Sequence, residues 1–163
     1  MAQNQKKKLR SKVFGGTYTE CAFLGQGMQS KVYQFVHRDE QGKRTMSYAC
    51  KLTSNRYLEG CDPEKSRKRW HSMVRELVLL ELIDSPHVVK VHEFIRTRHN
   101  FYMVQDYANG GSLQNLLNLH KCFPESIAKK ILKQIIQGCC ALYEKQVVHR
   151  DLKLDNCLIH FPN

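Results

Sequence analysis

The most specific stretch of the 163-residue sequence is His149-Arg150-Asp151-Leu152-Lys153-Leu154-Asp155-Asn156, close to its end. Six of its positions carry the residue types of a fixed pattern, and agreement at six positions arises by chance on the order of once in ten million windows. No other stretch of the sequence is as specific. The segments that precede it indicate what kind of domain carries it.

The composition is that of an ordinary globular domain, with 42% hydrophobic and 25% charged residues. No apolar run is long enough to cross a bilayer, and the N-terminal sequence MAQNQKKKLRSK lacks the apolar stretch of a secretory signal. We therefore expect a cytoplasmic protein, with the nucleus as the alternative, and no membrane partner.

The seven cysteines are predicted to be reduced thiols, because their number is odd and no CxxC pair occurs. Cys139 and Cys140 lie in a helical apolar pattern, where small thiols usually fill core space. The spacing of the cysteines does not support a zinc site.

Two basic clusters, in residues 6–12 and 65–69, account for much of the net charge of +11. A field of this sign favours polyanions, so nucleic-acid binding is one hypothesis. Base-reading motifs and patterns of stacking aromatics are absent, which favours a solvated tail and a charged helix face instead. Nucleic acid is therefore not an expected partner.

The first two-thirds of the chain predicts an antiparallel sheet of five strands with one long helix. Aromatic and β-branched residues with intervening turns place the strands at residues 17–24, 31–36, 47–52, 88–95 and 100–104. Apolar residues at helical spacing (Met73, Leu77, Leu80 and Ile83) predict an amphipathic helix over residues 69–84. Residues 1–17 are expected to be a disordered basic tail.

The remainder predicts helices. Ser112 is a suitable N-cap for a short helix that reaches residue 119, and Pro124 marks the start of a longer one that reaches about residue 145. The apolar stripe of the longer helix is too broad for a solvent-facing helix and needs cover on more than one side. We expect a partner or further chain to supply that cover.

Further motifs precede the His149–Asn156 stretch in a definite order. Gly25-Gln26-Gly27-Met28-Gln29-Ser30-Lys31-Val32 is a glycine-rich turn, with Ser30 in place of a third glycine. Ala49-Cys50-Lys51 lies in a predicted strand, and Met103-Val104-Gln105-Asp106-Tyr107 ends one. Together these motifs resemble the serine/threonine protein kinases over residues 18–159.

The resemblance implies an α+β, protein-kinase-like fold. Residues 18–105 would form the ATP-binding N-lobe, with its five-stranded sheet and one long helix. Residues 106–163 would form the hinge and the first helices and catalytic loop of an incomplete helical C-lobe. It implies ATP and Mg²⁺ as cofactors and protein serine or threonine hydroxyls as substrates.

The resemblance also implies the roles of individual residues. Asp151 would accept or orient the substrate hydroxyl, Lys153 would place a positive charge near the transferred phosphoryl group, and Asn156 would bind magnesium. Lys51 would pair with the α- and β-phosphates and with a helix glutamate. Glu76 shares the apolar face of its helix, so we expect Glu76 rather than Glu81 to be that partner.

The same resemblance predicts the nucleotide contacts. The backbone of Asp106 and Ala108 would hold adenine beside a gatekeeper Gln105, and Ser112 would contact the ribose unless it only caps its helix. The full set of expected nucleotide-binding residues is Gly25, Gln26, Gly27, Val32, Ala49, Lys51, Asp106, Ala108, Ser112 and Leu158. Of these, Val32 and Leu158 would enclose the adenine ring.

The sequence contains no Asp-Phe-Gly segment, whose aspartate holds the catalytic magnesium in this family. We therefore expect a kinase domain truncated before that segment, and a chain that is nearly inactive alone. The alternative is a non-catalytic half-kinase that acts as an ATP-binding or protein-interaction module.

Overall fold

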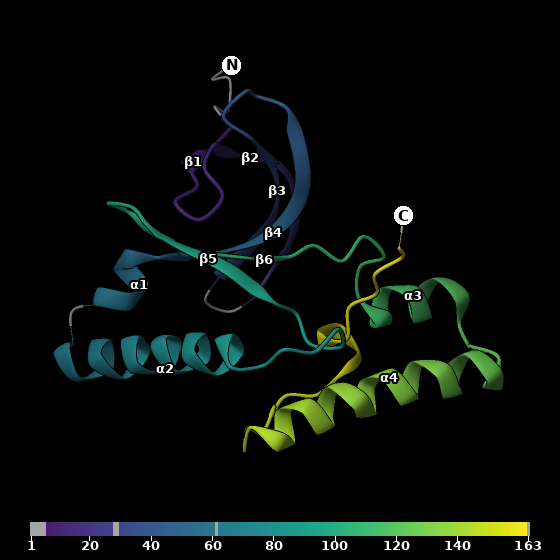
Figure 1. Cartoon of the computed structure of the whole chain (residues 1–163). Helices are drawn as coiled ribbons and strands as arrows, with labels where there is room; N and C mark the ends of the chain where they lie inside the picture. The colour runs from purple at the N-terminus through teal and green to yellow at the C-terminus, as the bar shows by residue number, and fades with distance from the viewer. Residues whose placement is uncertain (1–5, 28–29, 61, 163) are drawn as a thin grey trace. The chain divides into compact units, whose positions relative to one another are not determined.

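The computed structural model of the chain describes residues 6–27, 30–60 and 62–162 (Figure 1). These residues form two compact units. The first comprises the described residues up to Leu77 together with Val91–Tyr107, and the second comprises Val78–Lys90 together with the described residues from Ala108 onward. Within the described ranges no helix has both the length and the apolar character needed to cross a membrane.

The first unit is built on an antiparallel sheet with the order β1-β2-β3-β4-β6-β5. Its strands are β1 (Lys8–Arg10), β2 (Thr17–Gln26), β3 (Ser30–Arg38), β4 (Arg44–Ser54), β5 (Val91–Arg96) and β6 (Asn100–Asp106). The aromatic and β-branched runs in the sequence become β2 to β6, as their composition predicts. The protein-kinase-like α+β prediction is confirmed, but the number of strands is six instead of five.

The additional strand comes from the segment that the sequence placed in a disordered tail. Lys8 pairs with Thr19 and Arg10 with Thr17 along the edge of β2. Leu9, between them, is buried against the core of the sheet. The expectation of disorder was wrong for this strand because one buried leucine and a register with β2 outweigh the basic flanks.

One face of the sheet carries the core of the first unit. Side chains at alternate strand positions gather there, and the most deeply buried are Tyr18, Phe35, Cys50 and Val104. Burial raises the pKa of the Cys50 thiol to about 12, so Cys50 is a packing residue and not a nucleophile. The core is aromatic and aliphatic, which suits strands that pack on one face.

Two helices follow β4. The short α1 (Asn55–Glu59) was not predicted; its Asn55 is buried and donates to the carbonyl oxygens of Thr97 and Arg98 at the β5–β6 turn. The long α2 (Pro63–Glu81) begins six residues before the predicted helix and ends three residues before its predicted end. The predicted apolar positions of α2, such as Met73, are partly buried, as the helical spacing requires.

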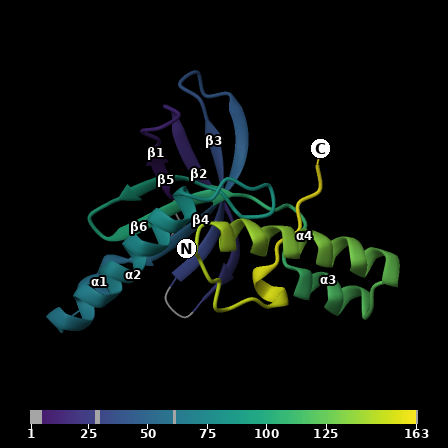
Figure 2. The same ribbon diagram turned by 60° about the horizontal axis from the view of Figure 1, so that its bottom comes forward.

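The second unit holds α3 (Leu113–His120), α4 (Glu125–Glu144) and the short 3₁₀ turn η1 (Leu154–Asn156). The Ser112 hydroxyl accepts a hydrogen bond from the Asn115 amide at 3.2 Å and so caps α3. Figures 1 and 2 both show α3 and α4 side by side, joined by a tight connection.

The broad apolar stripe of α4 is only partly covered. Leu132 and Ile136 are exposed, and so is Tyr143 near the end of the helix. Cys139 is half-buried but Cys140 is exposed, so the prediction that both thiols fill core space was wrong for Cys140. Cys140 lies on the flank of the stripe, which the described residues leave open.

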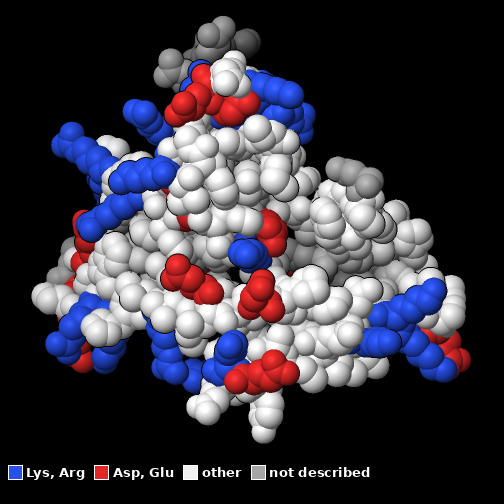
Figure 3. Space-filling model, viewed as in Figure 1, with Lys and Arg blue, Asp and Glu red and all other residues white. Residues whose placement is uncertain are grey.

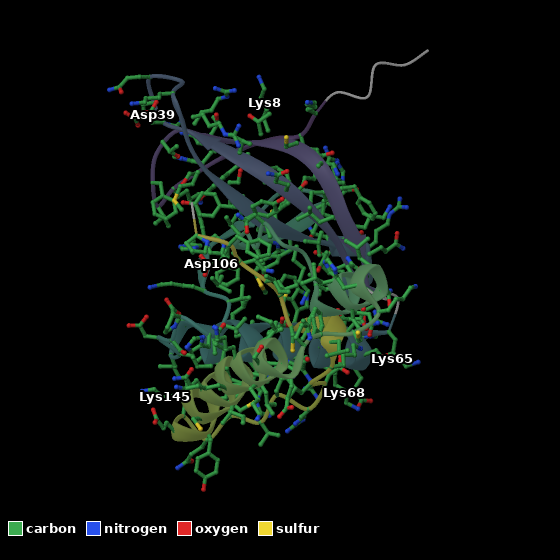
Figure 4. The ribbon with its side chains drawn as sticks, turned by 90° about the vertical axis from the view of Figure 1, so that its right-hand side faces the viewer. Lys8, Asp39, Lys65, Lys68, Asp106 and Lys145 are labelled. Atoms are coloured by element: carbon green, nitrogen blue, oxygen red, sulfur yellow. The ribbon has the colours of Figure 1, made fainter. Side chains whose placement is uncertain are left out.

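Charges of both signs occur together on the face of the described residues that Figure 3 shows. On the face shown in Figure 3, Lys and Arg side chains occur in separate groups with Asp and Glu among them. On α2, Lys65 pairs with Asp62 and Lys68 with Glu64, and Figure 4 shows both lysines pointing outward. This arrangement agrees with a solvated helix face.

Candidate functional site

The sequence-predicted site residues fall into two groups, one in each unit. The first unit holds the glycine-rich turn, the strand lysine, the helix glutamate and the start of the hinge. The second unit holds the end of the hinge and the catalytic stretch. Each group is described by itself.

Lys51 and Glu76 form an ion pair in the first unit. Lys51 lies in the middle of β4, where its partner across the ladder is Val32 of β3 on one side and Met103 of β6 on the other. Its Nζ lies 2.9 Å from Oε1 of Glu76 on α2. The pair therefore joins the sheet to the helix at the position that the spacing of Glu76 predicted, whereas Glu81 forms no ion pair within the described residues.

This pair orients the lysine more than it stabilises the fold. The side chains are 34% and 45% exposed for Lys51 and Glu76. Ion pairs with that much solvent contact contribute about 1 kcal/mol or less. The ammonium group is thus held in one place at small cost, with donors left for an anionic ligand, since an ammonium carries three.

A cavity of about 290 Å³ adjoins the ion pair. It lies between β4, β6, α1 and α2, and its lining residues include Lys51, Glu76, Met73 and Met103. Trp70 of α2 packs edge-on against Phe101 of β6, with ring centroids 6.2 Å apart. The Trp70 contact thus joins α2, the helix that carries Glu76, to the sheet.

The glycine-rich turn joins β2 to β3. Gly25 pairs with Val32 and Gln26 with Lys31, and the Gly27 amide donates to the Ser30 carbonyl oxygen at 2.9 Å. A Cβ added at Gly25 would meet nothing within 4 Å. Space beside the backbone is what a phosphate-covering turn needs, because amide groups can then approach an anion. Met28 and Gln29 of this motif lie outside the described residues.

The end of β6 brings the hinge residues beside β4. Ala49 pairs with Gln105, and Tyr48 pairs with Asp106. The Asp106 carboxylate lies 2.6 Å from Nε2 of His92 on β5. The sequence did not single out His92. Its place beside Asp106 follows from the pairing of β5 with β6, in which Val91 opposes Gln105.

In the second unit, the catalytic stretch is gathered around the Asp151 carboxylate. Lys153 Nζ and Asn156 Nδ2 each lie 3.0 Å from Asp151 Oδ2. Asn156 Nδ2 also donates to the Asp151 backbone oxygen at 2.7 Å. The turn η1 produces this convergence, because it returns residue 156 to the neighbourhood of residue 151.

These contacts favour the ionised form of Asp151. The hydrogen bond from Lys153, and then that from Asn156, lower the pKa of Asp151 below its ordinary value of 3.8. At neutral pH the group is a carboxylate that accepts hydrogen bonds. It is therefore suited to orient a hydroxyl donor and not to protonate a leaving group.

The backbone at this stretch is unusual. Arg150 has a φ of +65°, in the left-handed region that a long side chain rarely adopts. Backbone strain of this kind is found mainly at functional sites, where the surrounding contacts compensate for it. At Arg150 it precedes the carboxylate that the Lys153 and Asn156 contacts hold.

The residues that could hold a metal ion are few. The side-chain nitrogen of Asn156 donates to Asp151, so the carbonyl oxygen of the same amide points elsewhere. An amide oxygen is a hard ligand of the type that magnesium takes. In the described part of the chain, no group of three or more His, Cys, Asp or Glu side chains is arranged to hold a metal ion.

The remaining predicted nucleotide contacts of the second unit are joined by backbone hydrogen bonds. Ser112 and Leu158 form an isolated antiparallel bridge. The Ala108 carbonyl oxygen accepts from the Gly111 amide at 3.4 Å, and the Gly110 amide donates to Ile159 at 2.8 Å. The end of the hinge is thus paired with the segment that carries Leu158.

Comparisons with known proteins agree with this arrangement. Residues 18–163 match the model of the protein kinase domain. The chain is 32% identical over 151 residues to calcium-dependent protein kinase 4 of Plasmodium falciparum (isolate 3D7). The aligned region covers 93% of the chain and 27% of that kinase. It is 35% identical over 144 residues to the serine/threonine-protein kinase ATG1a of Arabidopsis thaliana. That alignment covers 88% of the chain and 21% of that kinase.

A third relative is the meiosis-specific serine/threonine-protein kinase mek1 of Schizosaccharomyces pombe, at 31% identity over 136 residues, with 83% of the chain and 28% of that kinase covered. The chain thus spans about a quarter of the length of these relatives. The family match covers nearly all of β2, the strands β3 to β6, the Lys51–Glu76 pair and the Asp151 stretch, and it begins after β1. The chain belongs to the protein kinase domain family.

Proposed function

We propose that the chain binds ATP with magnesium and supplies the nucleotide lobe and catalytic loop for phosphorylation of protein serine or threonine hydroxyls. The observation that carries this proposal is the Asp151 carboxylate, fixed at 3.0 Å by both Lys153 and Asn156. The serine/threonine kinase relatives support the same reaction class.

The proposed roles follow from the charges that phosphoryl transfer must manage. The reaction gains most of its rate from positioning and from neutralising charge on the phosphoryl oxygens. Lys51, held by Glu76, would bind the α- and β-phosphates, and the glycine-rich turn would cover them with backbone amides. Magnesium, when bound, supplies further positive charge to the phosphates, and Asn156 would be one of its ligands.

Asp151 would accept a hydrogen bond from the substrate hydroxyl and so direct its oxygen at the phosphorus. Its lowered pKa keeps it ionised, and therefore able to accept, at neutral pH. Lys153 would stabilise the negative charge near the transferred phosphoryl group, because its ammonium group already lies beside Asp151. With a lysine at this position, the catalytic stretch resembles that of serine/threonine kinases and not that of tyrosine kinases.

The matched test is Asp151→Asn, which keeps the size of the side chain and removes its charge. The 163-residue chain and this variant are given γ-labelled ATP, magnesium and a library of serine and threonine peptides, and ATP binding is measured in parallel. Both proteins should bind ATP. Because the sequence contains no Asp-Phe-Gly segment, the unmodified chain should transfer label only slowly, and Asp151→Asn should transfer none. Binding without transfer by either protein would favour the non-catalytic half-kinase, and no binding by either would refute the proposal.

A further inference from the structure

The residues that follow β1 form a closed loop that is anchored to the opposite edge of the sheet. In this loop, residues 11–16, the Ser11 amide donates to the Gly16 carbonyl oxygen at 3.2 Å. The buried Glu93 carboxylate of β5 accepts from the Ser11 hydroxyl at 2.7 Å, from the Lys12 amide at 2.5 Å and from the Tyr18 hydroxyl at 3.0 Å. Since β1 and β5 are the two edge strands, Glu93 links one edge to the other.

Two glycines let the anchored loop pass close to the sheet. Gly15 and Gly16 both have positive φ, at +69° and +65°. A Cβ added at Gly16 would lie 2.1 Å from the Arg38 carbonyl oxygen. The Gly15 carbonyl oxygen lies 2.8 Å from Nε2 of the buried His37. Both ends of the loop are therefore fixed to the sheet.

The loop directs Phe14 to the hinge end of the sheet. The Phe14 ring stacks on Tyr48 of β4 and contacts His92 of β5, with ring centroids 6.0 Å apart in both pairs. Tyr48 and His92 are themselves in edge contact at 5.2 Å. His92 in turn lies 2.6 Å from the Asp106 carboxylate, and Tyr48 is the ladder partner of Asp106. Figure 4 labels Asp106.

We propose that Phe14 is a positioning residue for nucleotide binding, which acts by holding His92 and Tyr48 against the hinge residue Asp106. The inference rests on the proposed binding of ATP, with the backbone of Asp106 holding adenine as the kinase resemblance implies. Phe14 does not itself touch the nucleotide in this account. Loss of its ring lets the His92 ring turn and frees the end of β6 to shift.

Val13 provides a matched control because it is the neighbour of Phe14 in the same loop. Val13 is 60% exposed and has no ring of its own, whereas Phe14 is 45% exposed and its ring lies against those of Tyr48, His37 and His92 on the sheet. If the loop mattered only for stability, Val13→Ala and Phe14→Ala would change nucleotide affinity equally little.

The experiment measures ADP affinity by calorimetry for the 163-residue chain, Val13→Ala, Phe14→Ala, His92→Ala and the double variant Phe14→Ala/His92→Ala. We expect Phe14→Ala and His92→Ala each to weaken ADP binding about threefold to tenfold, and Val13→Ala to leave it unchanged. When two residues act through one another, the effects of their substitutions on affinity do not add. The double variant should therefore bind ADP no more weakly than the single variant with the lower affinity. Additive losses, or equal affinities for Val13→Ala and Phe14→Ala, would overturn the proposal.

Amide NMR of the same proteins separates this inference from the proposed function. Phe14→Ala should move the Asp106 amide resonance without nucleotide present, and Val13→Ala should not. If the unmodified chain bound no ADP, the proposed function would fail, and the Asp106 resonance would still decide whether Phe14 sets the hinge. An Asp106 resonance that is the same in Phe14→Ala and in the unmodified chain would contradict the inference.

Discussion

The Glu93 contact predicts a large and specific loss of stability when its carboxylate is removed. Glu93→Ala leaves the Lys12 amide without its acceptor and forces the Ser11 and Tyr18 hydroxyls to find other partners. Each buried donor without a partner costs about 1–3 kcal/mol. The two hydroxyls lie 3.5 Å apart and can satisfy one another in part. The expected loss in the free energy of unfolding is therefore about 3 kcal/mol.

Glu93→Gln should be milder, and the difference tests the geometry. The amide oxygen of glutamine can still accept from Lys12, and its NH₂ group can donate to the Ser11 and Tyr18 hydroxyls once these have turned. We expect a loss of about 1 kcal/mol. The ordering of the two substitutions follows from the donors around Glu93 and not from its burial alone.

Urea denaturation followed by tryptophan fluorescence is the assay. The chain has a single tryptophan, Trp70, which packs on Phe101 of the sheet and so reports on the first unit. Glu59→Ala is the control, since Glu59 pairs with Arg96 at 3.1 Å on the surface, where an ion pair contributes about 0.5 kcal/mol or less. A loss in Glu93→Ala no larger than in Glu59→Ala would refute the reasoning.

Two further predictions concern the backbone and the catalytic stretch. Gly16→Ala should lower the free energy of unfolding of the first unit by more than about 2 kcal/mol, because its Cβ would lie 2.1 Å from the Arg38 carbonyl oxygen. Gly42→Ala, with φ +80° and open space around it, should lower this free energy by only about 1 kcal/mol. Urea denaturation measures both losses. In an NMR titration, Lys153→Met should raise the pKa of the Asp151 carboxyl toward its ordinary value of 3.8, since the Lys153 hydrogen bond is the main cause of its lowering. Because the folded pKa is depressed, this contact stabilises the stretch above pH 3.8 and is lost as the pH falls through the lowered pKa. An unchanged titration in Lys153→Met, or equal losses in the two glycine variants, would contradict these expectations.

Several features of the fold could be predicted because they depend on residues close together in sequence. The helical spacing of Met73, Leu77 and Leu80 placed Glu76 on the face of α2 that meets the sheet, and the structure has Glu76 there with Lys51. The Ser112 cap of α3 likewise needs only its own first turn.

Other features depend on contacts between distant residues and leave little signal in the sequence. Leu9 is a single apolar residue among lysines and arginines, and its burial depends on the register of β1 on β2. The loop that follows β1 is held by Glu93, which lies 82 residues from Ser11 and 81 residues from Lys12. The short α1 lies in a charged connector, and its Asn55 is buried because the β5–β6 turn supplies two carbonyl oxygens. His92 becomes a hinge contact only through the pairing of β5 with β6.

In the proposed function, the first unit binds the phosphates of ATP through Lys51. Its most direct test is the affinity of the 163-residue chain for ATP with magnesium, compared with that of Lys51→Met. Lys43→Met, an exposed lysine at the β3–β4 turn, is the control. Charge-assisted hydrogen bonds contribute about 1.5–3 kcal/mol, so Lys51→Met should weaken binding about tenfold or more while Lys43→Met leaves it unchanged. Equal affinities for all three proteins, or no saturable binding by any of them, would contradict the account.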